Sequence, residues 1–477
     1  MQMFINGKKC DSSTGKTMEV VNPANMQVID TVPVASEEDV KLAIVSAREG
    51  FTQWKEVPLY KRIAILTEMR QKLFAHVDEL AEILQKETGK LARSARLEIL
   101  GALSSMDPLF DYARTVGGMC TPVENRFGTD HSMAVTVRMP LGVVVGVVPF
   151  NYPVFSLVQK AVPALLMGNA VILKPSSDTP LADLRFVELM VEYGIPAQAV
   201  QIVTGRGSEI GKWLIDDDGV DCVMLTGSTD AGIEISKNSA PHLHRVRMEL
   251  GGNDAFIVLK DADLDAAVND AVNGRLSNAG QICTAGKRFV VHNSVKATFV
   301  EKLVAILAAK KLGDPLDETT DVGPVVSQRA AITIEKQIAH AVEQGAKVVL
   351  GGHRVNECYI EPTVMEVTKE CDVIHSDEIF GPVWSVIGYD TIEEAIAIAN
   401  DSKYGLSSSV QGKDMKELLQ VARGIVTGTC VINGPGNYGI NDAPFGGVKQ
   451  SGLGDGGGRF SLEDLTELKT IIFKGMF

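Results

Sequence analysis

A cysteine set among small residues is the first candidate for chemistry in this chain. Residues 278–288 read Asn-Ala-Gly-Gln-Ile-Cys-Thr-Ala-Gly-Lys-Arg, so Cys283 has room for a substrate at its sulfur, and two cations, Lys287 and Arg288, follow it. The thiolate is the reactive form of cysteine, and nearby positive charge favours that form. The alternative is that Cys283 only fills core space, as free cysteines usually do. The surroundings favour a nucleophile.

A lone carboxylate, Glu249, lies 34 residues before Cys283. Apolar residues flank it, and two glycines follow it at 251 and 252. Glycine lets the backbone approach a neighbouring group closely, and burial raises the pKa of a glutamate towards the range in which a general base works. Glu249 is therefore the candidate base.

These two motifs together carry a family resemblance. Glu-Leu-Gly-Gly at 249–252 followed by Gly-Gln-Ile-Cys at 280–283 resembles the general-base and nucleophile signatures of the aldehyde dehydrogenase superfamily, and further signatures follow in order along nearly the whole chain. The resemblance implies that Cys283 attacks an aldehyde through a thiohemiacetal and a thioester, and that Glu249 activates the water that hydrolyses the thioester. A covalent intermediate divides a difficult reaction into two easier steps. NADP or NAD is the implied cofactor.

An asparagine motif follows an apolar run of strand length. Residues 149–153 read Pro-Phe-Asn-Tyr-Pro, at the end of a predicted parallel strand, where ligand crevices open. The motif resembles the family's Pro-Trp-Asn-Phe-Pro with both aromatic residues exchanged. The resemblance implies that Asn151, with the backbone N–H of Cys283, holds the oxyanion, a contribution that is typically several kcal/mol. The alternative is that Asn151 caps the next helix.

The first cofactor motif is Leu-Lys-Pro-Ser-Ser at 173–177. It resembles the family segment whose lysine contacts the adenosine ribose, which assigns Lys174, Ser176 and Ser177 to the cofactor. Members that strongly prefer NAD often carry glutamate where Ser177 stands. Its absence removes a carboxylate that would repel a 2′-phosphate, and so it favours NADP. The alternative is an ordinary exposed loop.

Two further motifs complete the candidate cofactor site. Leu-Thr-Gly-Ser at 225–228 follows a predicted strand and opens a predicted helix, whose free N–H groups can meet a pyrophosphate; it resembles the family's phosphate turn through Gly227 and Ser228. Residues 378–382 resemble the family's Glu-x-Phe-Gly-Pro segment. The resemblance implies that Glu378 binds the nicotinamide ribose and that Phe380 flanks the ring. The alternatives are a strand end and a turn. Gly-x-Gly-x-x-x-Gly at 205–211 is a weaker fingerprint, because it has one residue too many.

Composition limits the other classes of function. The chain has 477 residues and a formal net charge of −14, which argues against a nucleic-acid partner. Its seven cysteines are scattered without a Cys-x-x-Cys pair, and its eight histidines do not cluster; even His242 and His244 have no obvious third ligand. We therefore expect no disulfide framework and no metal site. The start of the chain has no targeting pattern, and no apolar run reaches the length of a membrane span, so we expect a cytoplasmic protein.

Apolar runs that alternate with helical patterns predict two α/β domains with sheets buried on both faces. The resemblance places an NAD(P)-binding, Rossmann-like domain at 1–120 and 142–250, and an α/β catalytic domain at 251–450. It also implies a small β element for oligomerisation at 121–141 and 463–477, which joins a homodimer or homotetramer. Ser36 to Asp39 predict a capped helix start. Other predicted strands are 4–8, 20–24, 143–148, 171–173, 200–203, 222–225, 256–259, 289–291, 348–350, 429–433 and 468–474; predicted helices are 60–91, 92–115, 295–311 and 330–344.

The preferred substrate is a small aldehyde of the lactaldehyde or glycolaldehyde type. Family members that act on succinic semialdehyde or glyceraldehyde 3-phosphate often carry arginine where this chain has Ser277 or Ile282, and neither residue can pair with an anion. Arg275 could substitute from another direction, so succinic semialdehyde is the second choice. A CoA-acylating relative is an alternative that the presence of Glu249 weighs against. A catalytically silent member of the fold is the non-enzyme alternative.

Overall fold

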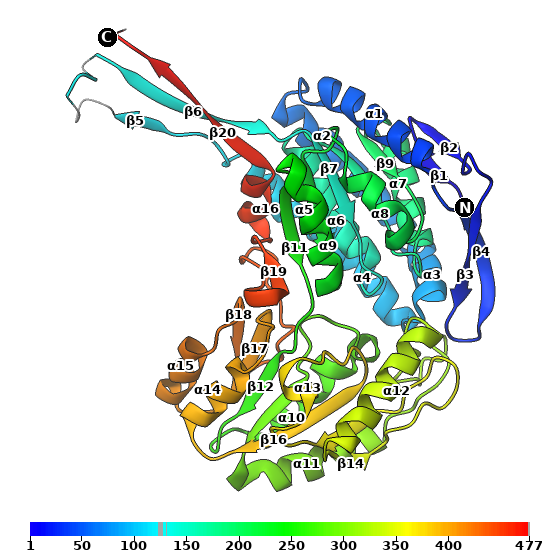
Figure 1. The fold of residues 1–477 in the computed structure, drawn as a ribbon, viewed down its shortest axis with the longest axis vertical. Helices are drawn as coiled ribbons and strands as arrows, with labels where there is room; N and C mark the ends of the chain where they lie inside the picture. The colour runs from blue at the N-terminus through cyan, green and yellow to red at the C-terminus, as the bar shows by residue number, and fades with distance from the viewer. Residues whose placement is uncertain (123–126, 130, 476–477) are drawn as a thin grey trace.

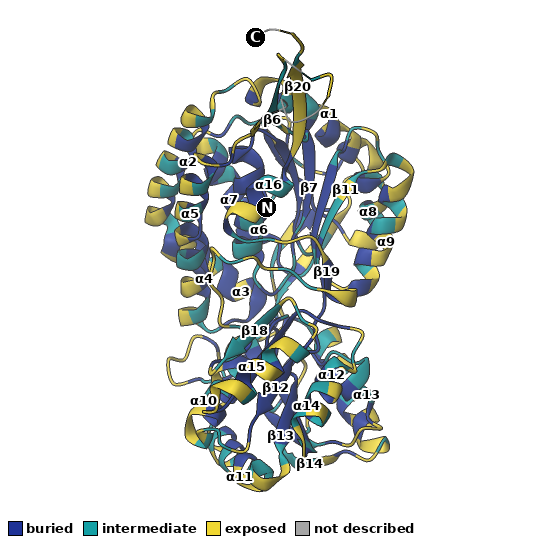
Figure 2. Cartoon of the chain, turned by 90° about the vertical axis from the view of Figure 1, so that its left-hand side faces the viewer, coloured by how far each residue is buried: buried dark blue, intermediate teal, exposed yellow. Residues whose placement is uncertain are grey.

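The computed structural model describes residues 1–122, 127–129 and 131–475. Its chain folds around two large sheets that lie one above the other in Figure 1, and a narrow arm extends from the upper one. The apolar runs of the sequence form the central strands, which are dark blue in Figure 2, while the helices around them turn exposed faces to solvent. Among the described residues, none of the helices combines the length and the apolar character that a membrane span needs.

The first sheet has eight strands in the order β19-β11-β10-β7-β8-β9-β1-β2. The five strands from β11 to β9 are parallel, and the outer strands run antiparallel to their neighbours. The carboxyl ends of these five strands therefore meet at one edge. The strands are β1 (Met3–Ile5), β2 (Lys8–Cys10), β7 (Val143–Val147), β8 (Ala170–Lys174), β9 (Val200–Ile202), β10 (Cys222–Thr226), β11 (Arg245–Glu249) and β19 (Gly452–Leu453).

The second sheet has seven strands in the order β14-β15-β16-β13-β12-β17-β18. All neighbours are parallel except β14 and β15. Its bounds are β12 (Ala255–Val258), β13 (Arg288–His292), β14 (Lys347–Leu350), β15 (Thr363–Glu366), β16 (Val383–Tyr389), β17 (Ser407–Gln411) and β18 (Thr429–Ile432).

The helices cover these sheets and connect their strands. The predicted capping box is confirmed at the start of the first helix: Ser36 Oγ accepts from the Asp39 N–H at 3.1 Å, and the Asp39 carboxylate accepts from the Ser36 N–H at 2.8 Å. With the first sheet lie α1 (Glu37–Trp54), α2 (Leu59–Leu73), η1 (Phe74–His76), α3 (Val77–Thr88), α4 (Ala92–Ser104), α5 (Met106–Ala113), α6 (Pro153–Leu166), α7 (Leu181–Glu192), α8 (Gly207–Ile215), α9 (Thr229–Ser239), η2 (Ala240–His242) and α16 (Gly458–Asp464). With the second lie α10 (Leu264–Leu276), η3 (Ser277–Gly280), α11 (Asn293–Ala308), α12 (Gln328–Glu343), α13 (Asp372–His375), α14 (Ile392–Asn400) and α15 (Met415–Gly424); η4 (Lys449–Ser451) precedes β19.

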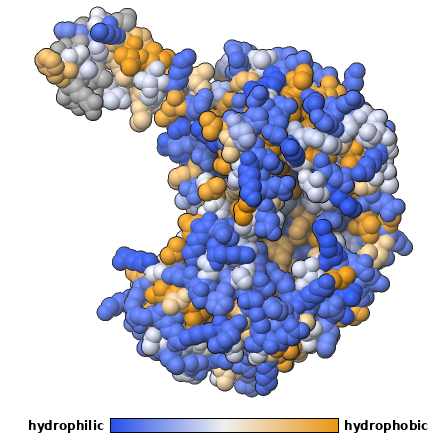
Figure 3. Space-filling model, in the orientation of Figure 1, coloured by the Kyte–Doolittle hydropathy of each residue, from blue (hydrophilic) through white to orange (hydrophobic). Residues whose placement is uncertain are grey.

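The arm consists of β5 (Cys120–Pro122), β6 (Met133–Pro140) and β20 (Thr466–Phe473). β20 pairs antiparallel with β6 along eight residues, and both strands reach away from the sheets in Figure 1. The arm projects from the rest of the surface in Figure 3. Apolar side chains lie exposed on it, with Leu468 at 50% and Ile472 at 68% exposure. The extended structure expected at 121–141 is confirmed where the chain is described; residues 123–126, 130 and 476–477 lie outside the described part. A separate ribbon pairs β3 (Thr17–Asn22) with β4 (Gln27–Pro33).

Some predicted elements differ in their details. The predicted strand at 4–8 is a hairpin, because Asn6 and Gly7 adopt positive φ angles of 49° and 74° between β1 and β2; such a turn matches the twist of paired strands. The predicted helix at 60–91 is divided into α2, η1 and α3. The domain boundaries near residues 120, 142 and 250 stay a prediction.

Candidate active site

A sharp reversal of the backbone precedes Cys283. Asn278 and Ala279 both have φ of 51° and Gly280 has φ of 78°, so three consecutive residues lie in the left-handed region. This region costs a non-glycine residue about 1–2 kcal/mol. A Cβ on Gly280 would lie 2.1 Å from the carbonyl oxygen of Gly381. Close packing against that turn therefore requires glycine and fixes the start of the cysteine loop.

Asn151 is hydrogen-bonded to this loop from the other sheet. It is buried, and its Nδ2 donates to the carbonyl of Gln281 at 3.0 Å, while Asn278 Nδ2 donates to the carbonyl of Asn151 at 3.1 Å. The helix that follows has Tyr152 as its N-cap and no side-chain cap bond. The alternative in which Asn151 caps the next helix is therefore wrong. Its side-chain amide instead binds the cysteine loop at Gln281, two residues before Cys283.

Glu249 and Cys283 face one another. Glu249 is the last residue of β11, and its Oε1 is shielded from solvent without a hydrogen-bond partner. Burial raises the pKa of Glu249 to about 7. A hydrogen bond with Cys283 and the charge of Lys160 act in the opposite direction and lower this pKa. Burial, and then the charge of Glu249 and that hydrogen bond, raise the pKa of the Cys283 thiol well above its ordinary value. The result is a protonated thiol hydrogen-bonded to a carboxyl group whose Oε1 has no partner.

The two cations that follow Cys283 have different surroundings. Lys287 is buried; its Nζ lies 3.2 Å from Glu378 Oε1 and donates to the carbonyls of Ile282 and Cys283. Its charge lowers the pKa of the thiol. Arg288 instead donates to four backbone carbonyls of other segments. The sequence predicts that both cations favour the thiolate. In the structure Lys287 does so, and Arg288 does not.

Glu378 and Phe380 lie against the same loop. Glu378 Oε1 accepts from the N–H of Gly252 at 3.1 Å, so its carboxylate contacts both the segment after Glu249 and the Lys287 side chain. The Phe380 ring packs edge-on against Phe150 with centroids 5.8 Å apart. The structure thus brings Asn151, Glu249, Cys283, Glu378 and Phe380 together, as the sequence predicts.

The remaining cofactor candidates lie at the carboxyl ends of β8 and β10, next to one another across the intervening β7. Lys174 ends β8 and is buried; its Nζ donates to the Pro175 carbonyl at 2.8 Å, and burial lowers its pKa to about 8 against the opposing charge of Asp178. A lysine ammonium carries three donors, so a ligand hydroxyl or phosphate fits here. Ser176 Oγ accepts from the Asp178 N–H at 3.2 Å, and Ser177 is half-buried beside it.

The phosphate-turn candidates adjoin the base. The N–H of Gly227 donates to the carbonyl of Glu249 at 3.0 Å. Ser228 is the N-cap of α9, where its hydroxyl accepts from the Ala231 N–H at 3.3 Å. A dinucleotide requires both hydrogen-bond donors and acceptors. The start of α9 and Lys174 supply donors, and the Glu378 carboxylate supplies acceptors.

Sequence reasoning missed Lys160. It is buried in α6, nine residues after Asn151, and its Nζ donates to Thr226 Oγ1 at 2.6 Å. Burial lowers its pKa to about 8, while the charge of Glu249 opposes that shift. The available signal was a lysine among buried apolar residues of a helix, since such a charge is rarely buried without a partner. Arg275, a candidate anion ligand, is fully enclosed and donates to the carbonyls of Gly280, Ile379 and Val383, so it is not available to a substrate.

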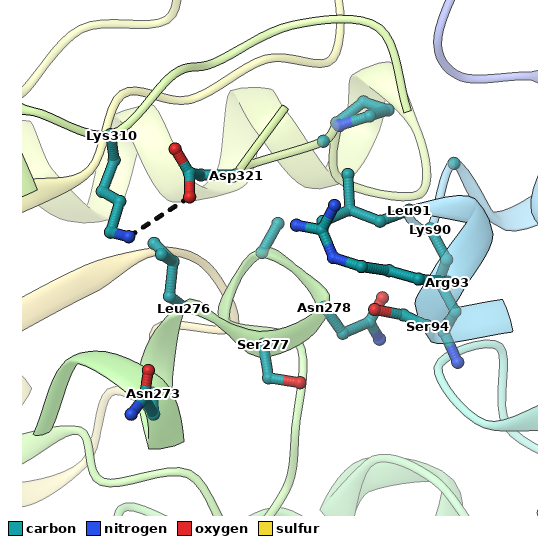
Figure 4. Close-up of a pocket in the computed structure, with 14 residues that line it drawn as sticks. Lys90, Leu91, Arg93, Ser94, Asn273, Leu276, Ser277, Asn278, Lys310 and Asp321 are labelled. Atoms are coloured by element: carbon teal, nitrogen blue, oxygen red, sulfur yellow. Dashed lines mark hydrogen bonds and ion pairs between the residues drawn. The ribbon is translucent and has the colours of Figure 1, made fainter. Parts of the chain in front are cut away.

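A pocket lies behind the cysteine loop rather than at the thiol. Figure 4 shows Arg93 and Leu91 facing Asn278 across it, with Ser277 below and the Lys310–Asp321 ion pair, at 3.2 Å, on the far side. Cys283 and Glu249 are not part of its lining. Within the described ranges, no group of three or more His, Cys, Asp or Glu side chains could hold a metal ion.

Comparison with known proteins shows the family of this chain. The model of the aldehyde dehydrogenase family matches residues 10–471. A 3-sulfolactaldehyde dehydrogenase of Priestia aryabhattai is 36% identical over 98% of this chain and 97% of its own length, and a glutarate-semialdehyde dehydrogenase of Pseudomonas putida is 34% identical over 98% and 96%. The crystal structure of betaine aldehyde dehydrogenase from Staphylococcus aureus in complex with NAD+ superposes with a TM-score of 0.96 at 33% identity, over 99% of this chain and 95% of that one. A match over nearly the full length, in sequence and in fold, shows that this chain belongs to the aldehyde dehydrogenase family.

Proposed function

We propose that this chain oxidises a small aldehyde to its carboxylic acid with NADP or NAD, with Cys283 as nucleophile, Glu249 as general base and Asn151 as oxyanion donor. The observation that carries the proposal is the shielded Glu249 carboxyl with a pKa of about 7, hydrogen-bonded to the Cys283 thiol. A base works best when its pKa lies near the operating pH.

In the first step the Cys283 thiolate attacks the aldehyde carbon; the proton of the thiol passes to solvent, so Glu249 is deprotonated and able to act as base in the second step. After burial, the charge of Glu249 is the next cause of the raised pKa of the thiol, so Glu249→Gln does not prevent the thiolate from forming. Asn151 carries two amide donors; one is directed at Gln281 in this structure, and the second can stabilise the oxygen that becomes negative. The backbone N–H of Cys283 is the second oxyanion donor.

The cofactor would be held by Lys174, Ser176, Ser177, Gly227, Ser228, Glu378 and Phe380. When bound, NADP or NAD supplies the hydride acceptor. The chain's own task after that is hydrolysis of the thioester on Cys283, for which Glu249 removes a proton from water. A CoA-acylating enzyme, in which CoA replaces this water, is the alternative that the presence of Glu249 weighs against.

A small hydroxyaldehyde such as lactaldehyde or glycolaldehyde is the proposed substrate. Arg275 is engaged by three carbonyls, and Ser277 is hydrogen-bonded to the Tyr152 hydroxyl. Arg275 is therefore not free to bind an acid group, and Ser277 has no charge with which to bind one. The second candidate is an aldehyde that also carries an acid group, in particular succinic semialdehyde. The names of the 3-sulfolactaldehyde dehydrogenase and the glutarate-semialdehyde dehydrogenase described above favour this candidate.

An aldehyde panel tests this proposal. Lactaldehyde, glycolaldehyde and succinic semialdehyde are each incubated with the protein and NADP or NAD, without CoA, while the absorbance of the reduced cofactor is followed. We expect oxidation without CoA and a kcat/KM for lactaldehyde above that for succinic semialdehyde. The reverse order would overturn the choice of substrate, and no turnover with any aldehyde would favour a silent member of the fold.

We further predict that NADP is accepted at least as well as NAD, because Ser177 offers a hydroxyl where a glutamate would repel the 2′-phosphate and Lys174 offers a cation close by. Ser177→Glu is expected to raise the KM for NADP about ten- to a hundredfold, since charge-assisted hydrogen bonds contribute roughly 1.5–3 kcal/mol, and to spare NAD. Ser177→Gln adds nearly the same volume without the charge and is the matched control. Unchanged NADP kinetics in Ser177→Glu would show that residue 177 does not face the ribose.

The arm is the proposed site of assembly into a homodimer or homotetramer. Exposed apolar side chains that lie together mark an interaction surface, and Leu468 and Ile472 are exposed on the arm in the single chain. The mass in solution, measured by light scattering over a range of concentrations, decides the point. A monomer throughout would contradict the proposal.

A further inference from the structure

Lys287 joins three segments of the site. Its ammonium contacts the carbonyls of Ile282 and Cys283 in the cysteine loop, and it lies 3.2 Å from Glu378 Oε1. The same Oε1 accepts from the Gly252 N–H at 3.1 Å, just beyond the base. The lysine also lies 6.0 Å from the centroid of the Phe380 ring. One side chain therefore connects the nucleophile, the segment after the base and the candidate ribose ligand.

This arrangement differs from ordinary structural support. The Lys287 side chain is 3% exposed and that of Glu378 is 16% exposed, so solvent screens their charges weakly. Lys287 uses two of its three donors on the two carbonyls, and its ammonium is also ion-paired with the Glu378 carboxylate. Arg275 and Arg288, in contrast, are directed at backbone carbonyls alone. A neutral side chain with N–H donors could hold these carbonyls; an ion pair beside a reactive sulfur also sets the local field.

We propose that Lys287 is a positioning residue for the reaction, which holds the Cys283 loop against Glu378 and provides the positive charge that stabilises the sulfur anion, with Glu378 moderating that charge. This inference rests on the proposed role of Cys283. Three charged groups act on the thiol: Glu249 and Asp254 disfavour the anion, and Lys287 favours it. The Tyr152 hydroxyl interacts with the same thiol.

The two members of the ion pair should have opposite effects. Without Lys287, the sulfur faces only negative neighbours, so the thiolate becomes harder to form. Without the charge of Glu378, the ammonium of Lys287 is no longer balanced and the thiolate becomes easier to form. If the substitutions acted only by damaging the fold, we would not expect the pH at which the thiolate forms to shift in opposite directions in the two variants.

The experiment measures alkylation of Cys283 by iodoacetamide in the full chain from pH 6 to pH 10, quantified by mass spectrometry of the peptide that contains it. Neither aldehyde nor cofactor is present, so the result does not depend on turnover. All variants carry Glu249→Gln, which removes the titration of Glu249 near pH 7 from the profile; Asp254, which also titrates near pH 7, is present in every variant and in the parent. The variants are Lys287→Gln, Lys287→Arg and Glu378→Gln. Lys302→Gln, at an exposed ion pair on α11, is the matched control.

Lys287→Gln is expected to move the midpoint to higher pH and to slow alkylation at pH 8 about tenfold, in line with an opposite charge close to a titrating group. Lys287→Arg should restore most of the rate, and Glu378→Gln should move the midpoint to lower pH. Equal profiles in Lys287→Gln and its parent would overturn the inference, and so would shifts of the same sign in Lys287→Gln and Glu378→Gln. An error in the proposed function would appear elsewhere, as turnover by a variant that lacks Cys283.

Discussion

Cys283→Ala is expected to lower kcat/KM for the aldehyde by about a thousandfold or more, because a covalent route has no substitute nucleophile at that position. Cys283→Ser should be similarly inactive, since a hydroxyl is a much weaker nucleophile than a thiol beside the same base. The affinity for the cofactor should change little, because the proposed contacts come from other segments of the chain. Steady-state kinetics with lactaldehyde, together with a cofactor titration followed by fluorescence, check both statements.

Cys120→Ser is the matched control for this experiment. Cys120 is an exposed cysteine on the arm, far along the chain from the site. Its replacement should leave turnover within about twofold of the wild type. Appreciable dehydrogenase activity in Cys283→Ala would show that the mechanism is wrong, even though the chain belongs to the family.

The sequence predicted the members of the site better than their contacts. Glu249, Cys283, Asn151, Glu378 and Phe380 were found from short motifs, and the structure places all five around one loop. Motifs are readable because each combines small residues with one reactive side chain at a fixed spacing. The direction in which a side chain points is set by tertiary packing, which a motif does not encode.

The basic residues near Cys283 illustrate that limit. Lys287 and Arg288 are adjacent in the sequence, yet one faces a carboxylate and the other faces backbone carbonyls. Arg275 looked like a possible anion ligand but is enclosed by carbonyls of the loop that it supports. An arginine can satisfy its donors with carbonyls alone, so a buried arginine next to a site is not by itself a substrate contact.

The fold shows a similar division between what the sequence predicts and what it does not. Apolar runs identified β7, β8, β10 and β12, which are buried on both faces. β17, with the sequence Ser-Ser-Ser-Val-Gln, was missed, although all five residues are buried. Two of its serines bind partners distant in sequence: the Ser407 hydroxyl donates to the Gly436 carbonyl at 2.8 Å, and the Ser408 hydroxyl donates to the Thr429 carbonyl at 3.1 Å. A search for apolar runs cannot find a strand whose buried hydroxyls are satisfied by tertiary contacts.

Glu249→Gln is expected to stop the reaction after the first half, with an acyl group left on Cys283. An amide cannot accept the proton of the attacking water, so thioester hydrolysis should slow about 10²- to 10⁴-fold, the usual contribution of a general base. Acid-quenched samples analysed by mass spectrometry should then show acylated Cys283 in the variant and little of it in the wild type. A variant without acyl-enzyme and without turnover would mean that Glu249 is needed mainly to deprotonate the thiol.

The dependence on pH gives this assignment a second, independent test. Burial raises the pKa of Glu249 to about 7, and only the deprotonated carboxylate can act as the base. Hydrolysis in the wild type should therefore be slow at pH 6, rise through pH 7 and become level above pH 8.

The buried Asp254 carboxyl, whose pKa burial also raises to about 7, could produce the same curve. Glu249→Gln separates the two, because the residual rate should no longer change between pH 6 and pH 8 if Glu249 is the titrating group. A rise through pH 7 that persisted in this variant would assign the titration to Asp254 and would remove Glu249 from the role of base.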